Sequence, residues 1–254
     1  MIIRPIYNLL LLPDVSYYFK RDFFTDFGAE ELENGSDILF IFLKEEKESG
    51  EYTAEDFYPI GISARVDGFG EEDSVAVRTL NRVNITELTN EDGRLTASVS
   101  LRPEADDLSE EEAKQQFSQL RSSLLRFVQG YQWGLWARSF ILQRKNIHDL
   151  ACALADYLNL NAEEKYNILA ADSRKARYAM ISAAISEFME IAKVSEEAQN
   201  AQKDNQEQLY REAAIKKQID YLQRELDEMH PENVSDVRKF EKKIESSGMN
   251  PEAR

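Results

Sequence analysis

The sequence has few of the residues from which enzymes and metalloproteins build their sites. Its single cysteine, Cys152, excludes an intramolecular disulfide and a cysteine-rich zinc site. The two histidines, His148 and His230, fall on different predicted elements, so we expect ordinary helix-surface roles for both. The motifs G-x-x-x-x-G-K-[ST] and G-x-G-x-x-G are missing, so no nucleotide-binding loop is predicted. We therefore expect neither a metal nor a cofactor in this chain.

Long apolar segments are missing as well. The longest apolar runs, residues 9–12 and 38–43, are far shorter than the roughly 20 residues that a membrane helix needs. The N-terminus has neither a charged leader nor a long apolar segment of the kind that directs secretion. Together with the single cysteine, these absences predict a cytoplasmic protein that contacts no membrane.

Positive charge is scarce. The 31 lysines and arginines face 47 aspartates and glutamates, which gives a formal net charge of −16. A protein that follows nucleic-acid phosphates needs a basic face, and so does a protein that binds anionic lipid. Both classes are therefore disfavoured. Hydrophobic residues make up 43% of the chain, which is enough for a real core and excludes general disorder.

Turn-forming residues are concentrated in the first half, where we expect a small β-barrel. Nine of the ten glycines lie at or before Gly134, and no glycine or proline occurs between that residue and Pro231. Short strands are predicted around residues 6–12, 38–43, 60–66, 75–83 and 85–88, and alternation over residues 95–101 predicts a half-buried strand. Residues 23–32 are the one candidate helix among them. This pattern predicts a β-domain over residues 1–105.

Helical periodicity begins after residue 105 and predicts a helical bundle over residues 106–194. Ser109 and Glu112 form a capping box, and apolar residues then recur every three or four positions. A second helix is predicted around residues 147–158, and Asn161 caps a third that runs to Ala170. The fold class is therefore α+β.

Residues 173–229 contain no glycine or proline, and we expect a long helix there that leads into a short coiled-coil hairpin over residues 195–254. One continuous helix of this length would measure about 85 Å. Residues 195–208 hold only two apolar residues, both alanine, so they form either a solvated helix or a flexible hinge. Beyond them a heptad seam is predicted, made of Ile215, Ile219, Leu222, Leu226 and Met229. A return helix is expected over residues 233–247, and the helix start at Pro251 indicates a truncated chain.

Catalytic chemistry is hard to find, and aromatic residues are the best candidates for a functional surface. Cys152 sits at an inward helical position without a histidine to activate it, so we interpret it as a structural thiol. Two aromatic groups are either core or an exposed binding patch. As a patch they would bind the apolar segments of unfolded polypeptides, and the acidic surface would keep the binder soluble. The candidate residues are Tyr17, Tyr18, Phe23, Phe24, Trp133 and Trp136.

Several segments resemble the N-terminal region of the ATP-dependent protease Lon. Residues 5–14, PIYNLLLLPD, are similar to the family's P-L-R-D-V-V-V-F-P-G. Residues 56–65, DFYPIGISAR, resemble D-L-Y-x-V-G-T-x-A-R, and residues 77–88, VRTLNRVNITEL, resemble V-x-G-x-x-R-V-x-I-x-E-L. Residues 151–169 and 215–226 match the family's helical and coiled-coil segments, whereas residues 106–146 match poorly. Tyr7 and Asp14 depart from the pattern, where the family has arginine and glycine.

The resemblance implies a PUA-like β-domain, a helical bundle and a long helix that leads to an ATPase module and a Ser-Lys protease module. Neither catalytic module is in this chain, so no catalytic residue is expected here. ATP and magnesium would be used by the ATPase module of the parent, an ATP-dependent serine endopeptidase. This region would bind unfolded or degron-bearing substrates within a homo-hexamer, and the isolated fragment would be a monomer or a weak dimer.

Two alternatives stay open at this stage. One is a stand-alone adaptor or scaffold that has a Lon-like N-terminal domain and no protease. The other is an RNA binder of the PUA type, which the net charge of −16 disfavours. An enzyme acting alone is the least favoured class, because no nucleophile, base or metal cluster was found.

Overall fold

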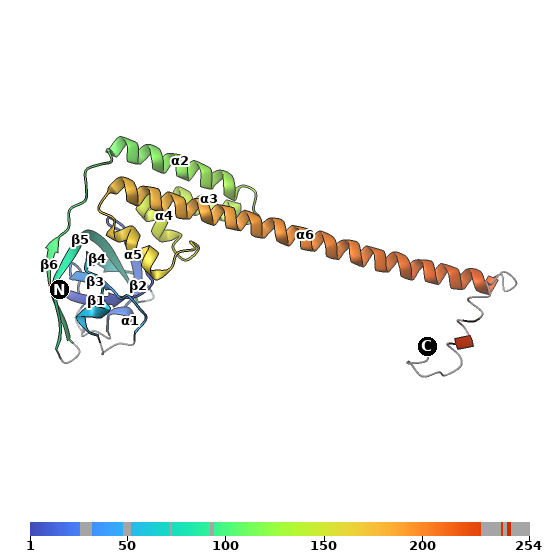
Figure 1. The fold of residues 1–254 in the computed structure, drawn as a ribbon, viewed down its shortest axis with the longest axis horizontal. Coiled ribbons are helices and arrows are strands. Elements are labelled where there is room, and N and C mark those ends of the chain that lie inside the picture. Colours follow the sequence, from blue (N-terminus) through green and yellow to red (C-terminus); the bar gives the residue numbers. More distant parts are fainter. Residues whose placement is uncertain are drawn as a thin grey trace. The chain divides into compact units, whose positions relative to one another are not determined.

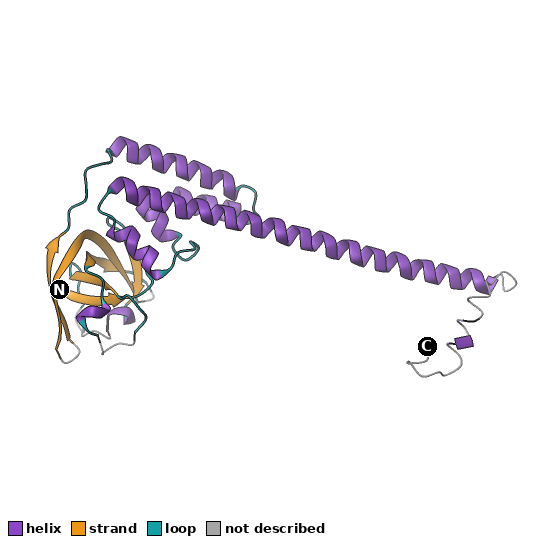
Figure 2. Ribbon diagram, viewed as in Figure 1, coloured by secondary structure: helices purple, strands orange, loops and turns teal. Residues whose placement is uncertain are grey.

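The computed structural model describes residues 1–25, 32–47, 52–71, 73–91 and 94–229, together with residues 240, 243 and 244. The chain divides into two compact units, Met1–Ala192 and Lys193–Arg254. The first unit holds a six-stranded sheet and most of the helices (Figures 1 and 2). No helix among the described residues is long and apolar enough to cross a membrane. The α+β fold class predicted from the sequence is confirmed.

The sheet is mixed, and its strand order is β1-β3-β4-β5-β2 with β6 also paired to β5. β1 pairs parallel with β3, and the other pairs are antiparallel. β2 and β6 both lie on the edge of β5 that β4 does not occupy, one toward each end of β5. The strands are β1 (Ile2–Ile6), β2 (Ser16–Lys20), β3 (Asp37–Phe42), β4 (Ile60–Phe69), β5 (Ser74–Glu91) and β6 (Arg94–Leu101).

The first predicted strand is wrong in position. β1 ends at Ile6, and residues 9–12 form no strand although Leu10, Leu11 and Leu12 are fully buried. Burial explains the apolar run, because an irregular segment that crosses a core needs apolar side chains as much as a strand does. The helix expected over residues 23–32 is α1 (Asp22–Thr25), and residues 26–31 lie outside the described residues. A single turn of 3-10 helix, η1 (Ala54–Asp56), was not predicted.

The helices of the first unit follow the predicted caps. Ser109 and Asn161 cap their helices as predicted, each in a capping box, and the apolar residues that recur every three or four positions along α2 are its buried residues. α3 was missed, because its N-cap residue, Trp133, makes no side-chain capping bond and gives no start signal. The helices are α2 (Glu110–Val128), α3 (Gly134–Leu142), α4 (Ile147–Ala153), α5 (Ala162–Ala170) and the first part of α6 (Arg174–Met229).

Two apolar clusters hold the first unit together. The larger is continuous from the strands through α2, α4 and α5 to Ile181 and Ile185 of α6. The smaller lies between Leu39 and Ile41 of β3 and the β5–β6 hairpin, and it includes Tyr52 and Phe57. Because strands and helices share the larger cluster, they form one compact unit. The division predicted at residues 105 and 106 falls between β6 and α2 and stays a prediction.

The second unit contains the rest of α6. Residues 195–208 are helical, so the solvated-helix alternative describes them and the flexible hinge does not. The five residues of the predicted seam are all exposed, from 46% for Ile219 to 70% for Met229. Most of the predicted return helix lies outside the described residues, so the antiparallel hairpin stays a prediction.

Candidate functional site

An apolar groove lies among the helices of the first unit. The groove has a volume of about 370 Å³, and its walls come from α2, α3, the segment after α4, and α6. The lining residues are Leu124, Val128, Trp133, Trp136, Ala137, Phe140, Ile141, Leu154, Tyr157, Phe188 and Ala192. None of these side chains is charged, so apolar and aromatic surface dominates the lining of the groove.

The sharp turn between α2 and α3 positions the tryptophans. A Cβ atom on Gly134 would lie 2.1 Å from the carbonyl oxygen of Val128, so only glycine allows α3 to begin this close to the end of α2. Trp133 packs at 4.8 Å from Tyr131, and Trp136 stacks at 5.5 Å on Phe140. These contacts cover only part of each indole, and Trp133 stays 45% and Trp136 65% exposed.

The sequence predicted the tryptophans as candidates but missed the opposite wall. Tyr157 is 62% exposed and packs against Phe188 of α6 at 6.5 Å. Neither residue belongs to the two aromatic groups of the sequence, and Tyr157 follows the end of α4. No local sequence signal places these two residues beside the tryptophans, because they come from elements far along the chain that meet only in the folded unit.

The other predicted aromatic group separates into core and surface. Phe24 has no exposed area, so it serves the core and is unavailable to a partner. The hydroxyl of Tyr17 donates toward Leu10 O at 3.2 Å and Cys152 Sγ at 2.8 Å, and it accepts from Leu12 N. Tyr17 therefore also serves the fold, and both residues are corrections to the candidate set.

The remaining two aromatic residues lie at an open surface beside β2. Tyr18 is 76% exposed, and Phe23 is half-buried and stacks on Phe19 at 4.8 Å. The guanidinium of Arg4 covers the ring of Phe23 at 4.2 Å. The side chain of Arg4 therefore covers part of this surface. The surface also includes charged residues, whereas the groove of the tryptophans has none.

Cys152 and His148 sit in interior environments without a nucleophilic arrangement. Burial raises the pKa of the Cys152 thiol to about 12, which matches the predicted structural thiol. His148 is not on the helix surface as expected. It is half-buried, its Nδ1 donates to the carbonyl oxygen of Pro13 at 3.2 Å, and burial followed by the charge of Arg177 lowers its pKa to about 4. His230 lies outside the described residues.

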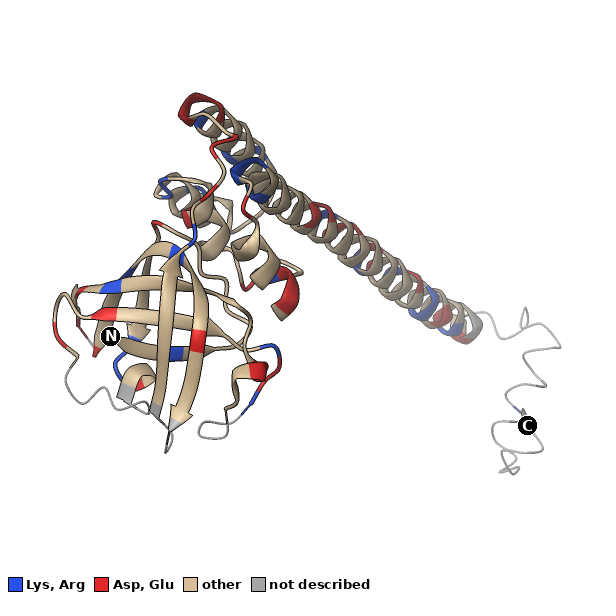
Figure 3. Cartoon of the chain, turned by 60° about the vertical axis from the view of Figure 1, so that its left-hand side comes forward, with Lys and Arg blue, Asp and Glu red and all other residues tan. Residues whose placement is uncertain are grey.

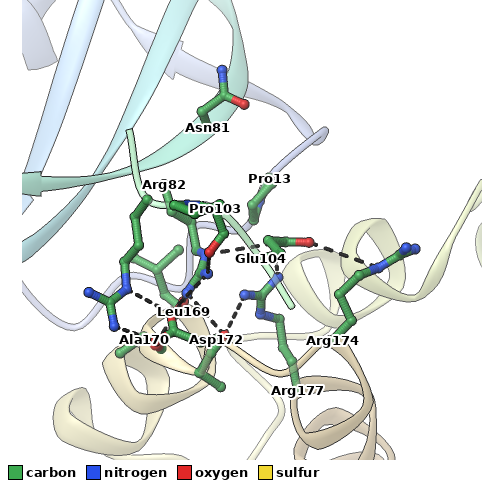
Figure 4. A network of polar contacts seen from close by, with 12 residues as sticks. Pro13, Asn81, Arg82, Pro103, Glu104, Leu169, Ala170, Asp172, Arg174 and Arg177 are labelled. Carbon is green, nitrogen blue, oxygen red and sulfur yellow. Dashed lines mark hydrogen bonds and ion pairs between the residues drawn. The ribbon is translucent and has the colours of Figure 1, made fainter. Parts of the chain in front are cut away.

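A polar clasp joins β5 to the helices (Figure 4). Arg82 and Arg177, both fully buried, donate to the last carbonyl oxygens of α5 and the residue after it. Glu104 pairs with both guanidinium groups, and Asp172 pairs with Arg82. Burial acts to raise the pKa of Glu104, but its bonds to Arg177 hold that pKa below the usual value. The clasp therefore fixes β5 to the end of α5 and to the first turn of α6.

No group of three or more histidine, cysteine, aspartate or glutamate side chains within the described ranges is placed to hold a metal ion. The apolar groove lies within the first compact unit.

The chain was compared with protein families, with known sequences and with solved structures. Relatives with similar sequences include the Lon protease of Clostridium beijerinckii, 21% identical over 98% of this chain and 32% of the relative. Another is the Lon protease of Buchnera aphidicola, 25% identical over 87% of this chain and 29% of the relative. The chain thus spans about a third or less of these relatives.

Among solved structures, the N-terminal domain of a Lon protease from the Mycobacterium avium complex covers 72% of this chain at 15% identity, with a TM-score of 0.47. The family model of the ATP-dependent protease La (LON) substrate-binding domain matches residues 3–187, which is most of the chain. The resemblance drawn from the motifs is therefore confirmed, and the chain belongs to the family of Lon substrate-binding domains.

Proposed function

We propose that the groove of Trp133 and Trp136 captures apolar side chains of unfolded polypeptides, as the substrate-engaging region of an ATP-dependent serine protease. The observation that carries this proposal is the exposure of two tryptophans, 45% and 65%, on the wall of an uncharged groove. Monomeric proteins rarely leave such apolar area open unless a partner covers it. A misfolded substrate exposes the complementary side chains, which a folded protein buries.

The surrounding charge suits this partner. The chain carries a formal net charge of −16, while the groove itself has no charged lining residue. Apolar contact would give affinity, and the like charge on neighbouring copies would keep the open grooves from associating with one another. Single grooves bind weakly, so we propose that several copies act together in a hexamer.

The finer assignments follow from the relatives. We propose a bacterial cytoplasmic protein whose longer form would hydrolyse ATP with magnesium and cleave peptides in modules outside these 254 residues. An immunoblot of native cell extract, with an antibody against this chain, tests this. A band several times heavier than a 254-residue chain is expected, and a band of the chain's own size would favour the stand-alone adaptor instead.

The chain's only two tryptophans both line the groove, so their fluorescence reports on it directly. We would titrate the protein with a permanently unfolded, carboxymethylated protein that lacks tryptophan. The expected result is a blue shift of the emission as the indoles leave water, and no shift with the same probe protein in its native form.

Variants then localise the binding. Trp136→Ala should weaken capture of the unfolded probe about tenfold, which corresponds to losing roughly 1.4 kcal/mol of apolar contact. Leu135→Ala is the matched control, because Leu135 is 87% exposed on the same helix but does not line the groove. Equal affinities for the two variants, with native circular dichroism, would remove the groove from the binding surface. Loss of native structure in Trp136→Ala would instead assign the residue to the core.

A further inference from the structure

β6 ends the sheet with one side unpaired. Within the described residues it pairs only with β5, in antiparallel register from Glu91 and Arg94 to Val83 and Leu101. Figure 3 shows β6 in the hairpin that crosses over the other strands, with its outer side facing away from β5. A strand in this position presents a row of backbone N–H and C=O groups along its free edge.

The hydrogen bonds toward β5 show which residues form that row. Arg102 N donates to Arg82 O at 2.9 Å, and the hydroxyl of Thr86 donates to Ser98 O at 2.9 Å. Residues in an antiparallel strand alternate, so every second residue directs its backbone groups to the partner strand and the others direct theirs away. The residues whose backbone groups point outward are therefore Ala97, Val99 and Leu101.

This edge has no charged residue, no proline and no bulge over residues 95–101, LTASVSL, and β1 approaches β6 without pairing with it. The register shift in the hairpin adds its extra residue to β5 rather than to β6. Natural edge strands commonly carry lysine, proline or a bulge, which prevent a further strand from joining. Val99 is 37% and Leu101 64% exposed on the same face, so apolar area lies beside the open backbone groups.

We propose that the outer edge of β6 binds an extended segment of unfolded polypeptide as an added strand. This inference rests on the proposed function and adds that the captured segment is bound in extended conformation. Folded proteins have already paired their backbone groups, whereas an unfolded segment carries free ones in extended form. Backbone pairing is independent of side-chain sequence, and Val99 and Leu101 would add contacts to alternate side chains.

Amide exchange measured residue by residue tests the geometry directly. The probe is a soluble peptide that alternates threonine and valine between lysine ends. On binding, the amides of Val99 and Leu101 should exchange more slowly, while those of Ser98 and Ser100, already directed to β5, should stay unchanged. Protection without this alternation, or confined to the groove of the tryptophans, would overturn the inference. Protection that rises with protein concentration in the absence of peptide would assign the edge to a second copy and also overturn it.

A matched pair of variants tests the same backbone group. Val99→Pro removes the outward N–H and leaves the ladder to β5 intact, because an edge strand tolerates proline on its free side. It should weaken peptide binding about tenfold, as expected for the loss of one backbone bond and the fit around it. Val99→Thr keeps the backbone donor and should bind within about twofold of the unchanged protein. If Val99→Pro does not fold, the amide-exchange experiment on the unchanged protein still shows whether the outer edge of β6 binds the peptide.

The inference and the proposed function fail in different ways. If Trp136→Ala loses the peptide and Val99→Pro retains it, capture in the groove stands and pairing at β6 is wrong. If Val99→Pro loses the peptide and Val99→Thr retains it, the edge binds substrate whatever the groove does. Equal binding by both valine variants would contradict a backbone-directed site.

Discussion

The guanidinium Nη1 of Arg82 lies 3.0 Å from the carbonyl oxygen of Ala171, so a strand residue completes the end of a helix that follows it by almost ninety positions. The last carbonyls of a helix have no partner within the helix. Arg82 donates to three of these oxygens, at Leu169, Ala170 and Ala171, and Arg177 donates to Ile168 and Ala171. The C-terminal end of α5 is thereby fixed to β5.

Arg82→Ala should destabilise the first unit by about 3–5 kcal/mol, because it removes one member of a buried charge network and leaves Glu104 and Asp172 short of a partner. Arg82→Lys should recover only part of this, since one ammonium cannot span the oxygens that the guanidinium reaches. Urea unfolding followed by circular dichroism measures both. The control is Arg65→Ala, which breaks an exposed ion pair to Asp37 and should leave the unfolding midpoint unchanged. Equal midpoints for Arg82→Ala and Arg65→Ala would show that the clasp contributes nothing.

Gly61→Ala should also destabilise the sheet. A Cβ atom at Gly61 would lie 2.7 Å from the carbonyl oxygen of Phe40 on the neighbouring strand, so β3 and β4 would have to move apart. We expect a loss of about 1–3 kcal/mol, typical of overpacking in a tight core. Gly130→Ala is the control, because its Cβ would meet Phe127 O at an ordinary 3.8 Å. The comparison uses the same urea unfolding curves, and a Gly61→Ala midpoint at or above that of Gly130→Ala would contradict the steric account.

These two residues also explain part of the sequence resemblance in physical terms. Gly61 is the glycine of the motif at residues 56–65, and Arg82 is the arginine of the motif at residues 77–88. Neither role can be derived from local spacing. The oxygen that excludes a side chain at Gly61 comes from Phe40, and the oxygens that need Arg82 come from α5.

Helices with strong local signals could be predicted, and elements fixed by distant packing could not. Ser109 and Asn161 cap their helices through their own side chains, so the sequence is enough. α3 begins at Gly134, its N-cap residue Trp133 makes no side-chain capping bond, and Gly134 packs against the end of α2. Residues 9–12 are apolar because they cross the core. For the site, Trp133 and Trp136 could be found by their type, whereas Tyr157 and Phe188 join them only in the folded unit.

Cys152 should be unreactive toward a thiol reagent while the protein is folded. Burial raises its pKa to about 12, so almost no thiolate exists at pH 8, and Tyr17 donates a hydrogen bond to its sulfur at 2.8 Å. As the only cysteine, it gives an unambiguous signal when labelling is followed by mass spectrometry. Labelling should begin at the urea concentration where circular dichroism is lost. Tyr17→Phe removes the hydrogen bond to sulfur and should lower that concentration. Rapid labelling of the native protein would contradict a buried structural thiol.

His148 should make stability depend on pH between about 6.5 and 4. In the unfolded chain the imidazole has a pKa near 6.5, whereas in the folded protein burial, followed by the charge of Arg177, lowers it to about 4. Between these values the unfolded chain binds a proton that the folded protein does not, so the free energy of unfolding falls as the pH falls. The loss should be on the order of 2–3 kcal/mol by pH 4 and should not grow further from this group below that pH.

His148→Gln separates this contribution from that of the carboxylates. Glutamine can still donate to Pro13 O but does not titrate. The free energy of unfolding of the variant should therefore stay constant between pH 6.5 and about 4.5. The lowered pKa of Glu104 acts in a different window, because its stabilisation is complete above the unfolded value of 4.5 and is lost as the pH falls through its folded pKa. The free energy of unfolding of the variant should therefore still fall below pH 4.5. Its dependence on pH between 6.5 and 4.5 should be gone. An unchanged slope between pH 6.5 and 4.5 in His148→Gln would assign that dependence to groups other than the half-buried imidazole.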